Sequence, residues 1–258
     1  MRDGLSLALW MGIVLIGSAD VSFAGATYSW EGGGSFSYLR GDYGQEQDSE
    51  IYYTALTVKR YFTRGDLTVT IPYLKMPTEG VTFVGGELEA TGTGGGGSGL
   101  GDILLKGRYY AVEQAGLLPF IDLVGSLKFP TAARDKGLGT GEFDFTILTE
   151  LAWRLGDSPW VALAELGYTL VGRPAGLDAR NRWLYSLGLA YELDAKTTLS
   201  SYLDGRTAIF PGNEDPLSIL LVGQYKFRPD LRLDAMMEFG LTDGAPDFGF
   251  SVGLRRRI

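Results

Sequence analysis

The sequence contains no histidine and no cysteine among its 258 residues. Without cysteine the chain has no disulfide, no thiol nucleophile and no thiolate metal ligand, and without histidine it lacks the commonest general base and metal ligand. A Ser-His-Asp triad is therefore excluded. The lack of cysteine does not identify a redox compartment, because a cysteine-free chain suits an oxidising periplasm and a reducing cytosol alike.

Positive charge is also scarce, since 23 lysines and arginines stand against 31 aspartates and glutamates. The net charge is −8 and the isoelectric point is about 4.7. A nucleic-acid partner requires a basic face that displaces counterions from phosphates, so neither DNA nor RNA is expected to bind. Beyond the N-terminus no run of ~18 uncharged apolar residues occurs, and no membrane-spanning helix is predicted there.

The N-terminus is the one place where apolar residues run together. Arg2 precedes an apolar core from Leu5 to Ile16, and the small residues Ala24 and Ala26 follow. This order is typical of a secretory signal peptide. An uncleaved membrane anchor is the alternative, but the core is shorter than the ~20 residues that cross a bilayer as a helix. We predict a signal peptide over residues 1–24 and a single domain over residues 25–258.

Glycine, in contrast, is abundant, with 38 residues or ~15% of the chain against an average near 7%. Residues 90–101, ATGTGGGGSGLG, match the phosphate-binding pattern G-x-G-x-x-G twice. That pattern needs a helix after the glycines. After Gly101, however, charged side chains at Asp102, Lys106 and Arg108 alternate with apolar or small ones, which predicts a strand. The run is therefore interpreted as a loop between strands.

The same alternation extends through most of the chain. In residues 121–129 the odd positions are apolar or glycine, whereas the even positions include Asp122, Ser126 and Lys128. Similar segments lie at 67–73, 143–155, 160–170, 183–193, 217–227, 231–241 and 248–258, with weaker ones at 27–41, 50–62, 101–111 and 197–209. We predict an all-β fold, an antiparallel up-and-down transmembrane β-barrel of about twelve strands.

The predicted connections alternate between short and long. Short turns fall near 63–65, 113–116, 156–158, 194–196 and 229–230, and longer loops at 43–49, 77–100, 130–141, 172–181, 210–216 and 242–246. Outer-membrane barrels have short periplasmic turns and longer external loops. The alternative is a soluble β-sandwich or lipocalin-like barrel, in which the apolar side chains point inward. Aromatic residues near both ends of the predicted strands resemble the two girdles of a membrane barrel and favour that fold.

Two segments resemble a known family of outer-membrane β-barrel transporters linked to the meta-pathway of phenol degradation. Residues 97–110, GSGLGDILLKGRYY, are similar to its Ser-Gly-Leu-Gly-Asp strand opening, and residues 126–145, SLKFPTAARDKGLGTGEFDF, to its strand, Pro-Thr and G-x-G-T-G loop. The C-terminal DFGFSVGLRRRI is consistent with the family. The resemblance implies export to a Gram-negative outer membrane and passage of small solutes, and it brings no catalytic residues. The chain departs from the usual terminal phenylalanine by ending in Ile258.

If the apolar side chains face lipid, the charged residues between them line the lumen. The predicted pore-lining residues are Asp102, Lys106, Arg108, Asp122, Lys128, Asp144, Glu150, Arg154, Glu165, Arg232, Asp234, Glu238, Arg255 and Arg257. The same alternation places Glu142, Lys226 and Arg228 in the lumen as well. Since both signs are present, many of these side chains should pair. They either set the electric field along a pore or only fill and rigidify the barrel. Twelve strands lie between the about eight that side chains can fill and the about sixteen that leave a wide channel, so the pore should be narrow.

The predicted function is an outer-membrane channel for passive passage of small solutes, with aromatic or hydrophobic compounds as candidates. The alternative is a plugged, non-conducting barrel that serves as a structural or interaction platform. No enzyme activity, cofactor or metal is expected, although the carboxylates in residues 42–50 offer oxygen ligands for Ca²⁺ without EF-hand spacing. The expected partners are outer-membrane lipid and small-molecule solutes. The loop 77–100, with its glycines, is predicted to pack over or into the pore mouth.

Overall fold

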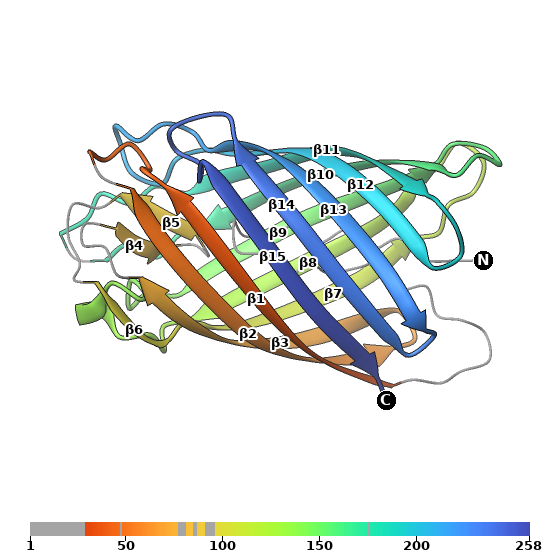
Figure 1. Cartoon of the computed structure of the whole chain (residues 1–258), viewed down its shortest axis with the longest axis horizontal. Coiled ribbons are helices and arrows are strands. Elements are labelled where there is room, and N and C mark those ends of the chain that lie inside the picture. The colour runs from red at the N-terminus through yellow and green to blue at the C-terminus, as the bar shows by residue number, and fades with distance from the viewer. Residues whose placement is uncertain (1–28, 47, 77–80, 85–86, 91–95, 175) are drawn as a thin grey trace.

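The computed structural model describes residues 29–46, 48–76, 81–84, 87–90, 96–174 and 176–258. Twelve antiparallel strands close into a barrel (Figure 1), which confirms the predicted fold. The barrel strands are β1 (Trp30–Gly41), β2 (Ser49–Phe62), β3 (Gly65–Met76), β7 (Ile103–Val112), β8 (Phe120–Phe129), β9 (Asp144–Arg154), β10 (Trp160–Leu170), β11 (Arg182–Glu192), β12 (Thr197–Arg206), β13 (Leu217–Arg228), β14 (Leu231–Gly240) and β15 (Phe248–Arg257). Each strand pairs with its neighbours in chain order, and β1 also pairs with β15.

The seam between β1 and β15 closes the cylinder. At its centre the Ser251 hydroxyl donates to the Ser37 hydroxyl at 2.7 Å, across 214 positions of sequence. At its end the Ile258 amide donates to the Trp30 carbonyl at 2.8 Å. The Ile258 side chain is 73% exposed on the outer face. It therefore has the outward orientation that the alternation over residues 248–258 predicts, at the position where outer-membrane barrels usually carry phenylalanine.

Connections of two kinds separate the two ends of the barrel. The turns that follow β2, β7, β9, β11 and β13 define the short-turn end, and the longer segments define the long-loop end. The long-loop end carries a small hairpin of β4 (Val81–Val84) and β5 (Glu87–Ala90), and the 3-10 helix η1 (Arg134–Lys136), as Figure 1 shows. Within the described ranges, no helix has the length and hydropathy of a membrane span.

The predicted strand at 101–111 is longer than expected and is interrupted. The segment β6 (Gly97–Leu100) pairs with the end of β3, and β7 continues along the same strand. Leu100 lies opposite Tyr73 and Leu104 opposite Thr70, so this side uses one residue more than β3. Such a bulge lets two consecutive residues face the same way, and Gly101 and Asp102 are both buried on the inner face.

The predicted boundary of the long loop was therefore wrong, because Gly97–Leu100 belong to the barrel wall and not to a loop 77–100. The backbone amides of this segment hydrogen-bond within the sheet, which removes them from phosphate binding. Residues 77–80, 85–86 and 91–95 lie outside the described residues. The proposed closure of the pore mouth by this loop falls largely on them and stays a prediction.

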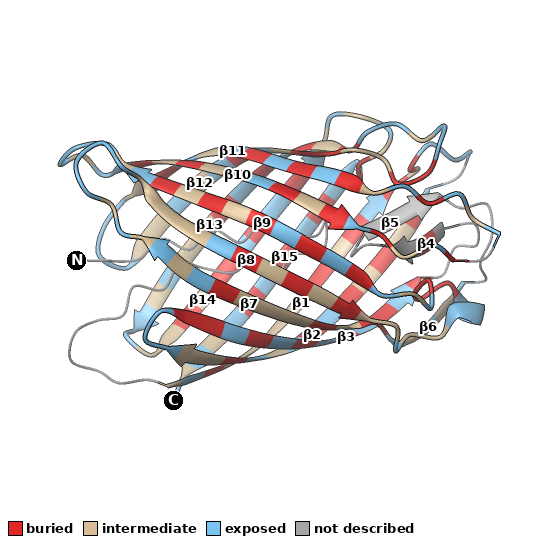
Figure 2. Ribbon diagram, turned by 180° about the vertical axis from the view of Figure 1, so that it is seen from behind, coloured by how far each residue is buried: buried red, intermediate tan, exposed pale blue. Residues whose placement is uncertain are grey.

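Burial alternates along each strand, as Figure 2 shows. On β8, Leu123 is 45% exposed on the outer face, whereas Val124 and Ser126 are buried on the inner face. The exposed positions of the other strands are mostly apolar as well. An apolar outer surface of this extent is stable against lipid but not against water, so the soluble alternative, with its apolar side chains inward, does not describe this barrel.

Aromatic rings gather at both ends of the outer face. The rings of Trp160 and Tyr191 meet at 4.6 Å between centroids near the short-turn end, and those of Phe129 and Phe143 at 5.8 Å near the long-loop end. Aromatic side chains favour the level of the lipid head groups. The two girdles thus bound the lipid-facing apolar zone of the outer wall.

The turn between β11 and β12 contains a carboxyl whose contribution to stability depends on pH. Both Lys196 and Thr197 donate their backbone amides to Asp194 Oδ1 at 2.7 Å, and these bonds lower the pKa of the Asp194 carboxyl below its usual 3.8. A carboxyl whose pKa is lower in the folded state than in the unfolded state stabilises the folded state at pH values above the unfolded-state pKa. This stabilisation is lost as the pH falls through the folded-state pKa. We expect Asp194→Asn to be less stable than wild type at pH 7 and equal to it at the acid end of the titration. Unfolding curves of both proteins over this pH range measure the difference; a difference that persists in acid would contradict the assignment.

Candidate functional site on the inner face of the barrel

The candidate site is the inner face of the barrel, because the buried polar side chains collect there. The predicted pore-lining residues lie at inward-facing positions of the strands or of the bulge, and most are buried, with two exceptions. Glu142 lies in the loop before β9, and the bulge between Lys226 and Arg228 turns Arg228 to the outer face. Most of the predicted residues form three groups along the barrel axis, which are described from the long-loop end to the short-turn end. Whether they line a conducting pore stays a prediction.

The first group is an ion triad at the long-loop end. Lys128 Nζ lies 3.0 Å from Asp102 Oδ2 and 3.0 Å from Asp144 Oδ2, and it donates to Thr140 Oγ1 at 3.1 Å. The remaining carboxylate oxygens accept from backbone amides, Asp102 Oδ1 from Ala132 and Asp144 Oδ1 from Gly172. Because Ala132 and Gly172 belong to two different loops, the triad fastens both loops to the wall.

The loop held by this triad, residues 130–143, also packs against the inner wall. Leu138 is fully buried in an apolar cluster with Leu39, Ile51, Tyr53 and Leu74, which belong to β1, β2 and β3. A methyl group added at Gly99 would contact the Leu138 side chain, so the loop also lies close to β6. This part of the mouth is therefore filled by side chains.

The second group surrounds Arg108 on β7. Its Nη2 donates to Glu150 Oε1 at 2.9 Å, and its Nη1 lies 3.9 Å from Asp122 Oδ2. Asp66, on the other neighbouring strand, accepts from the Tyr110 hydroxyl at 2.9 Å and lies 4.0 Å from Lys59 Nζ.

Two further predicted residues lie beside this group. Lys106 occupies the next inward position of β7, and Glu165 on β10 lies directly opposite Glu150 in the register. The group places several charges in one part of the lumen where water is scarce, so each charge depends on its neighbours.

The third group lies toward the short-turn end. Asp234 is fully buried between Arg232 and Arg255, with Nε to carboxylate distances of 3.0 and 3.4 Å. Arg257 approaches Glu31 at 3.5 Å.

Across the lumen from that pairing, Arg154 forms a bidentate pair with Glu192 at 2.7 and 2.6 Å. Planar, paired contacts of this kind are the strongest ion-pair geometry in proteins.

Glu238 on β14 is another predicted residue and stands apart from the three groups. It accepts a hydrogen bond from the Ser218 hydroxyl at 2.9 Å. Several inward charges were not among the predicted residues, because they lie on weakly patterned strands or at strand ends: Glu31, Lys59, Asp66, Arg182, Glu192, Asp204 and Arg206. Arg182 is fully buried, and its Nε donates to the Thr207 carbonyl. The alternation of β2 and β11 would have identified Lys59 and Arg182.

An apolar band on the inner wall was also missed. It crosses β9 to β14 and consists of Ala152, Val161, Leu163, Ala190, Tyr202, Leu220, Val222 and Met236. The Tyr202 ring lies flat on the wall, because a Cβ at Gly188 would overlap it. A sequence signal for this band exists in β10, WVALAELGYTL, where both faces are largely apolar. On these strands the band lies between charged inward positions: Glu150 and Arg154 flank Ala152 on β9, and Asp234 and Glu238 flank Met236 on β14.

Metal-ligand groups were sought among the residues that the structure describes. No group of three or more acidic residues there has the spacing of a metal site. The acidic loop 42–50, which the sequence offered as a Ca²⁺ ligand set, is engaged otherwise. Asp48 pairs with Arg40 at 2.6 Å and Asp42 accepts from the Gly44 amide at 2.8 Å.

Comparisons with known proteins agree with this architecture. Residues 17–258 match the sequence family described as "Putative MetA-pathway of phenol degradation", and no curated protein matches the chain. An outer-membrane channel from Pseudomonas putida F1 is 13% identical with a TM-score of 0.69, over 93% of this chain and 100% of that one. The KdgM porin is 8% identical (TM-score 0.54; 88% and 99% covered), and the CymD monoaromatic hydrocarbon channel is 8% identical (TM-score 0.51; 90% and 89% covered). At such identities the likeness concerns the fold, an outer-membrane type of barrel.

Proposed function

Because the chain belongs to the family associated with phenol degradation, we propose that it is an outer-membrane channel through which small solutes pass passively. The observation that carries the proposal is the division of the inner face into an apolar band and charged groups. A planar solute with one polar substituent can place its ring against the apolar band and its polar group toward one of the charged groups that flank the band. Aromatic or hydrophobic compounds are therefore the proposed solutes, in line with the names of similar structures such as the CymD monoaromatic hydrocarbon channel.

We propose the same domain plan and location that the sequence indicates. Residues 1–24 act as the export signal, and residues 25–258 form the barrel in a Gram-negative outer membrane. The short-turn end then faces the periplasm, and the long-loop end faces the exterior, as in other outer-membrane barrels. The lipid of that membrane covers the apolar outer face.

A plugged, non-conducting barrel is the second candidate function, and one observation favours it. The side chains of the apolar band are buried against their neighbours, and Leu138 fills part of the mouth. Single-channel recording of the purified protein in planar bilayers separates the two candidates. Conductance above the bare bilayer supports the channel, whereas a silent barrel at every salt concentration supports the platform.

Replacing apolar side chains of the band should reduce the passage of aromatic solutes. For Leu220→Asn combined with Val222→Asn, we expect roughly tenfold slower entry of a monoaromatic solute, because the ring would lie against amide groups that it cannot hydrogen-bond, at a cost of about 1–2 kcal/mol. Entry of a small sugar should change little. Liposome swelling with each solute measures the two rates.

Gln224→Asn is the matched control, since Gln224 faces inward on the same strand outside the band. Equal slowing of both solutes by the double variant, or the same effect in the control, would contradict a role of the band in solute selection.

A further inference from the structure

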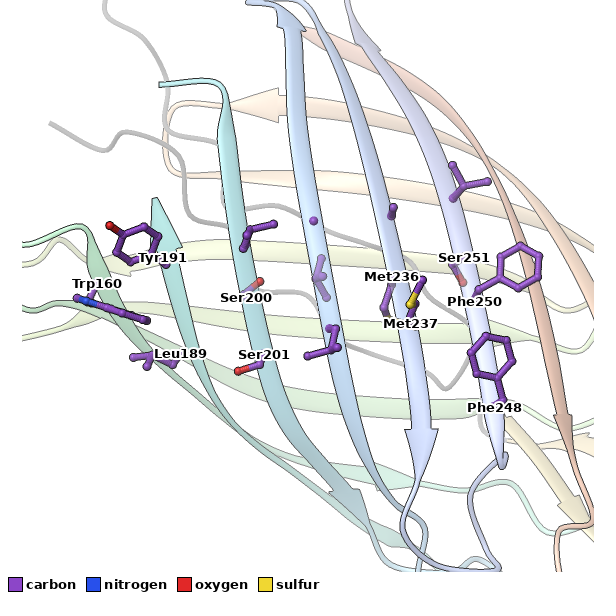
Figure 3. Close-up of a pocket in the computed structure, with 16 residues that line it drawn as sticks. Trp160, Leu189, Tyr191, Ser200, Ser201, Met236, Met237, Phe248, Phe250 and Ser251 are labelled. Atoms are coloured by element: carbon purple, nitrogen blue, oxygen red, sulfur yellow. The ribbon is translucent and has the colours of Figure 1, made fainter. Parts of the chain in front are cut away.

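An apolar depression of about 920 Å³ crosses β10 to β15, and most of its lining side chains, such as Trp160, Leu199 and Met237, face outward. Four inward-facing residues of the same strands, Ser200, Val222, Met236 and Ser251, also line it. Figure 3 shows Trp160 and Tyr191 at one end and Phe248 and Phe250 at the other. Between these large side chains, the small residues Ser201, Gly223 and Ala235 form the floor. We call this depression the lipid-side groove. It lies in the apolar outer surface, where bilayer hydrocarbon is its natural occupant.

A cluster of positive charge lies on the same outer face, toward the short-turn end. Arg228 on β13 and Arg256 on β15 flank Leu231 in the register, so the three side chains point to the same side. Both guanidinium groups approach one carboxylate, that of Asp230, at 3.1 and 3.5 Å, and their side chains remain 56% and 65% exposed. Two cations that share one anion leave a surplus of positive charge at this point.

The groove and the cluster lie on the same outer face of β15, with Leu254 between them. Val252 lines the groove, and Arg256 follows four residues later on the same face, about 13 Å along the strand. The neighbouring turn adds the exposed Lys196, three residues before Leu199 of the groove. The lipid-side groove thus points toward basic side chains at the level where lipid head groups meet water.

We propose that this surface binds one phospholipid with an anionic head group. The phosphate and head group contact Arg228 and Arg256, and one acyl chain lies in the lipid-side groove over Gly223. Charge complementarity identifies the ligand class, because basic residues at a membrane surface favour anionic lipid over zwitterionic lipid. A second copy of the chain fits less well, since a symmetric contact would bring the arginines of both copies together and remove them from water.

Lipid retention by the purified full-length protein tests the proposal. Native mass spectrometry after mixing with equal amounts of phosphatidylglycerol and phosphatidylcholine should show one retained phosphatidylglycerol on the wild type. Arg228→Gln combined with Arg256→Gln should weaken that retention roughly 5-fold for each arginine, or ~30-fold for the pair. Arg64→Gln is the matched control, because Arg64 is exposed in the turn between β2 and β3, at the same end of the barrel, and does not line the groove.

The groove is tested separately by filling it. Gly223→Leu should displace the acyl chain, and an added Cβ there meets only the Leu199 side chain at 3.7 Å and an open space, so the barrel tolerates it. Gly125→Leu on β8 is the control, since nothing lies within 4 Å of an added Cβ at that lipid-facing position. Loss of lipid with Gly223→Leu alone supports the site.

Equal retention of both lipids by the wild type, or retention unchanged in the arginine double variant, would overturn the proposal. A stable dimer in place of a lipid adduct would do the same. None of these measurements depends on solute passage, so they stand apart from the test of the channel.

Discussion

Replacement of Arg108 by methionine is expected to lower the free energy of unfolding by about 3–5 kcal/mol. Arg108 is buried, and its guanidinium compensates Glu150 at 2.9 Å and Asp122 at 3.9 Å. Methionine fills a similar volume but leaves these carboxylates without their partner in a poorly hydrated lumen. Titration with urea in a lipid-reconstituted sample measures the loss.

The double variant Arg108→Met with Glu150→Met distinguishes an unpaired charge from a packing defect. Since a buried pair can often be replaced by apolar residues without loss, the second change should restore a large part of the stability. Restoration should be incomplete, because Asp122 and Asp66 remain nearby. A double variant that is less stable than Arg108→Met would show that the arginine acts by shape and not by charge.

Placing an arginine at Leu123 should cost roughly 2–4 kcal/mol of barrel stability. Leu123 lies on the outer face of β8, well inside the strand, so its substituent would enter hydrocarbon near the middle of the bilayer. The same free-energy measurement as for Arg108 applies, together with the yield of folded barrel in lipid vesicles.

The control for this substitution places an arginine inward. Ser186 lies at an inward position of β11, opposite Glu165 on one side and Asp204 on the other, so Ser186→Arg gains two carboxylate neighbours and should be tolerated. Ser126 also faces inward and is polar, but it is a poorer control position, because an arginine there would lie directly opposite Lys106. If Leu123→Arg and Ser186→Arg had equal effects, the assignment of outer and inner faces would be wrong.

The barrel could be predicted because each strand carries its own signal. Alternation along residues 121–129 or 231–241 depends only on which side chains face lipid, and the lengths of the connections follow from the two ends of the barrel. Local patterns of this kind survive in a single sequence. The positions of the inward charges followed from the same alternation once the strands were assigned.

Pairing partners could not be predicted, because they depend on the register between strands. Lys128 meets Asp102 through the bulge at Gly101, and a shift of one residue is not visible in a glycine-rich segment. The apolar inner band escaped notice for a different reason. The expectation of a polar lumen assigned every apolar position to the outside, although Val222 and Met236 lie at inward positions of their strands.

The seam between β1 and β15 has a consequence for how the barrel forms. Ser37 and Ser251 meet across 214 positions of sequence, whereas every other strand of the cylinder pairs with a neighbour in chain order. Contacts between residues far apart in the sequence form late in folding, because bringing them together costs chain entropy before the contact stabilises the fold. Until they form, β1 and β15 are open edges that can pair with other chains. Variants that weaken this seam should therefore aggregate during assembly even when the rest of the cylinder is sound.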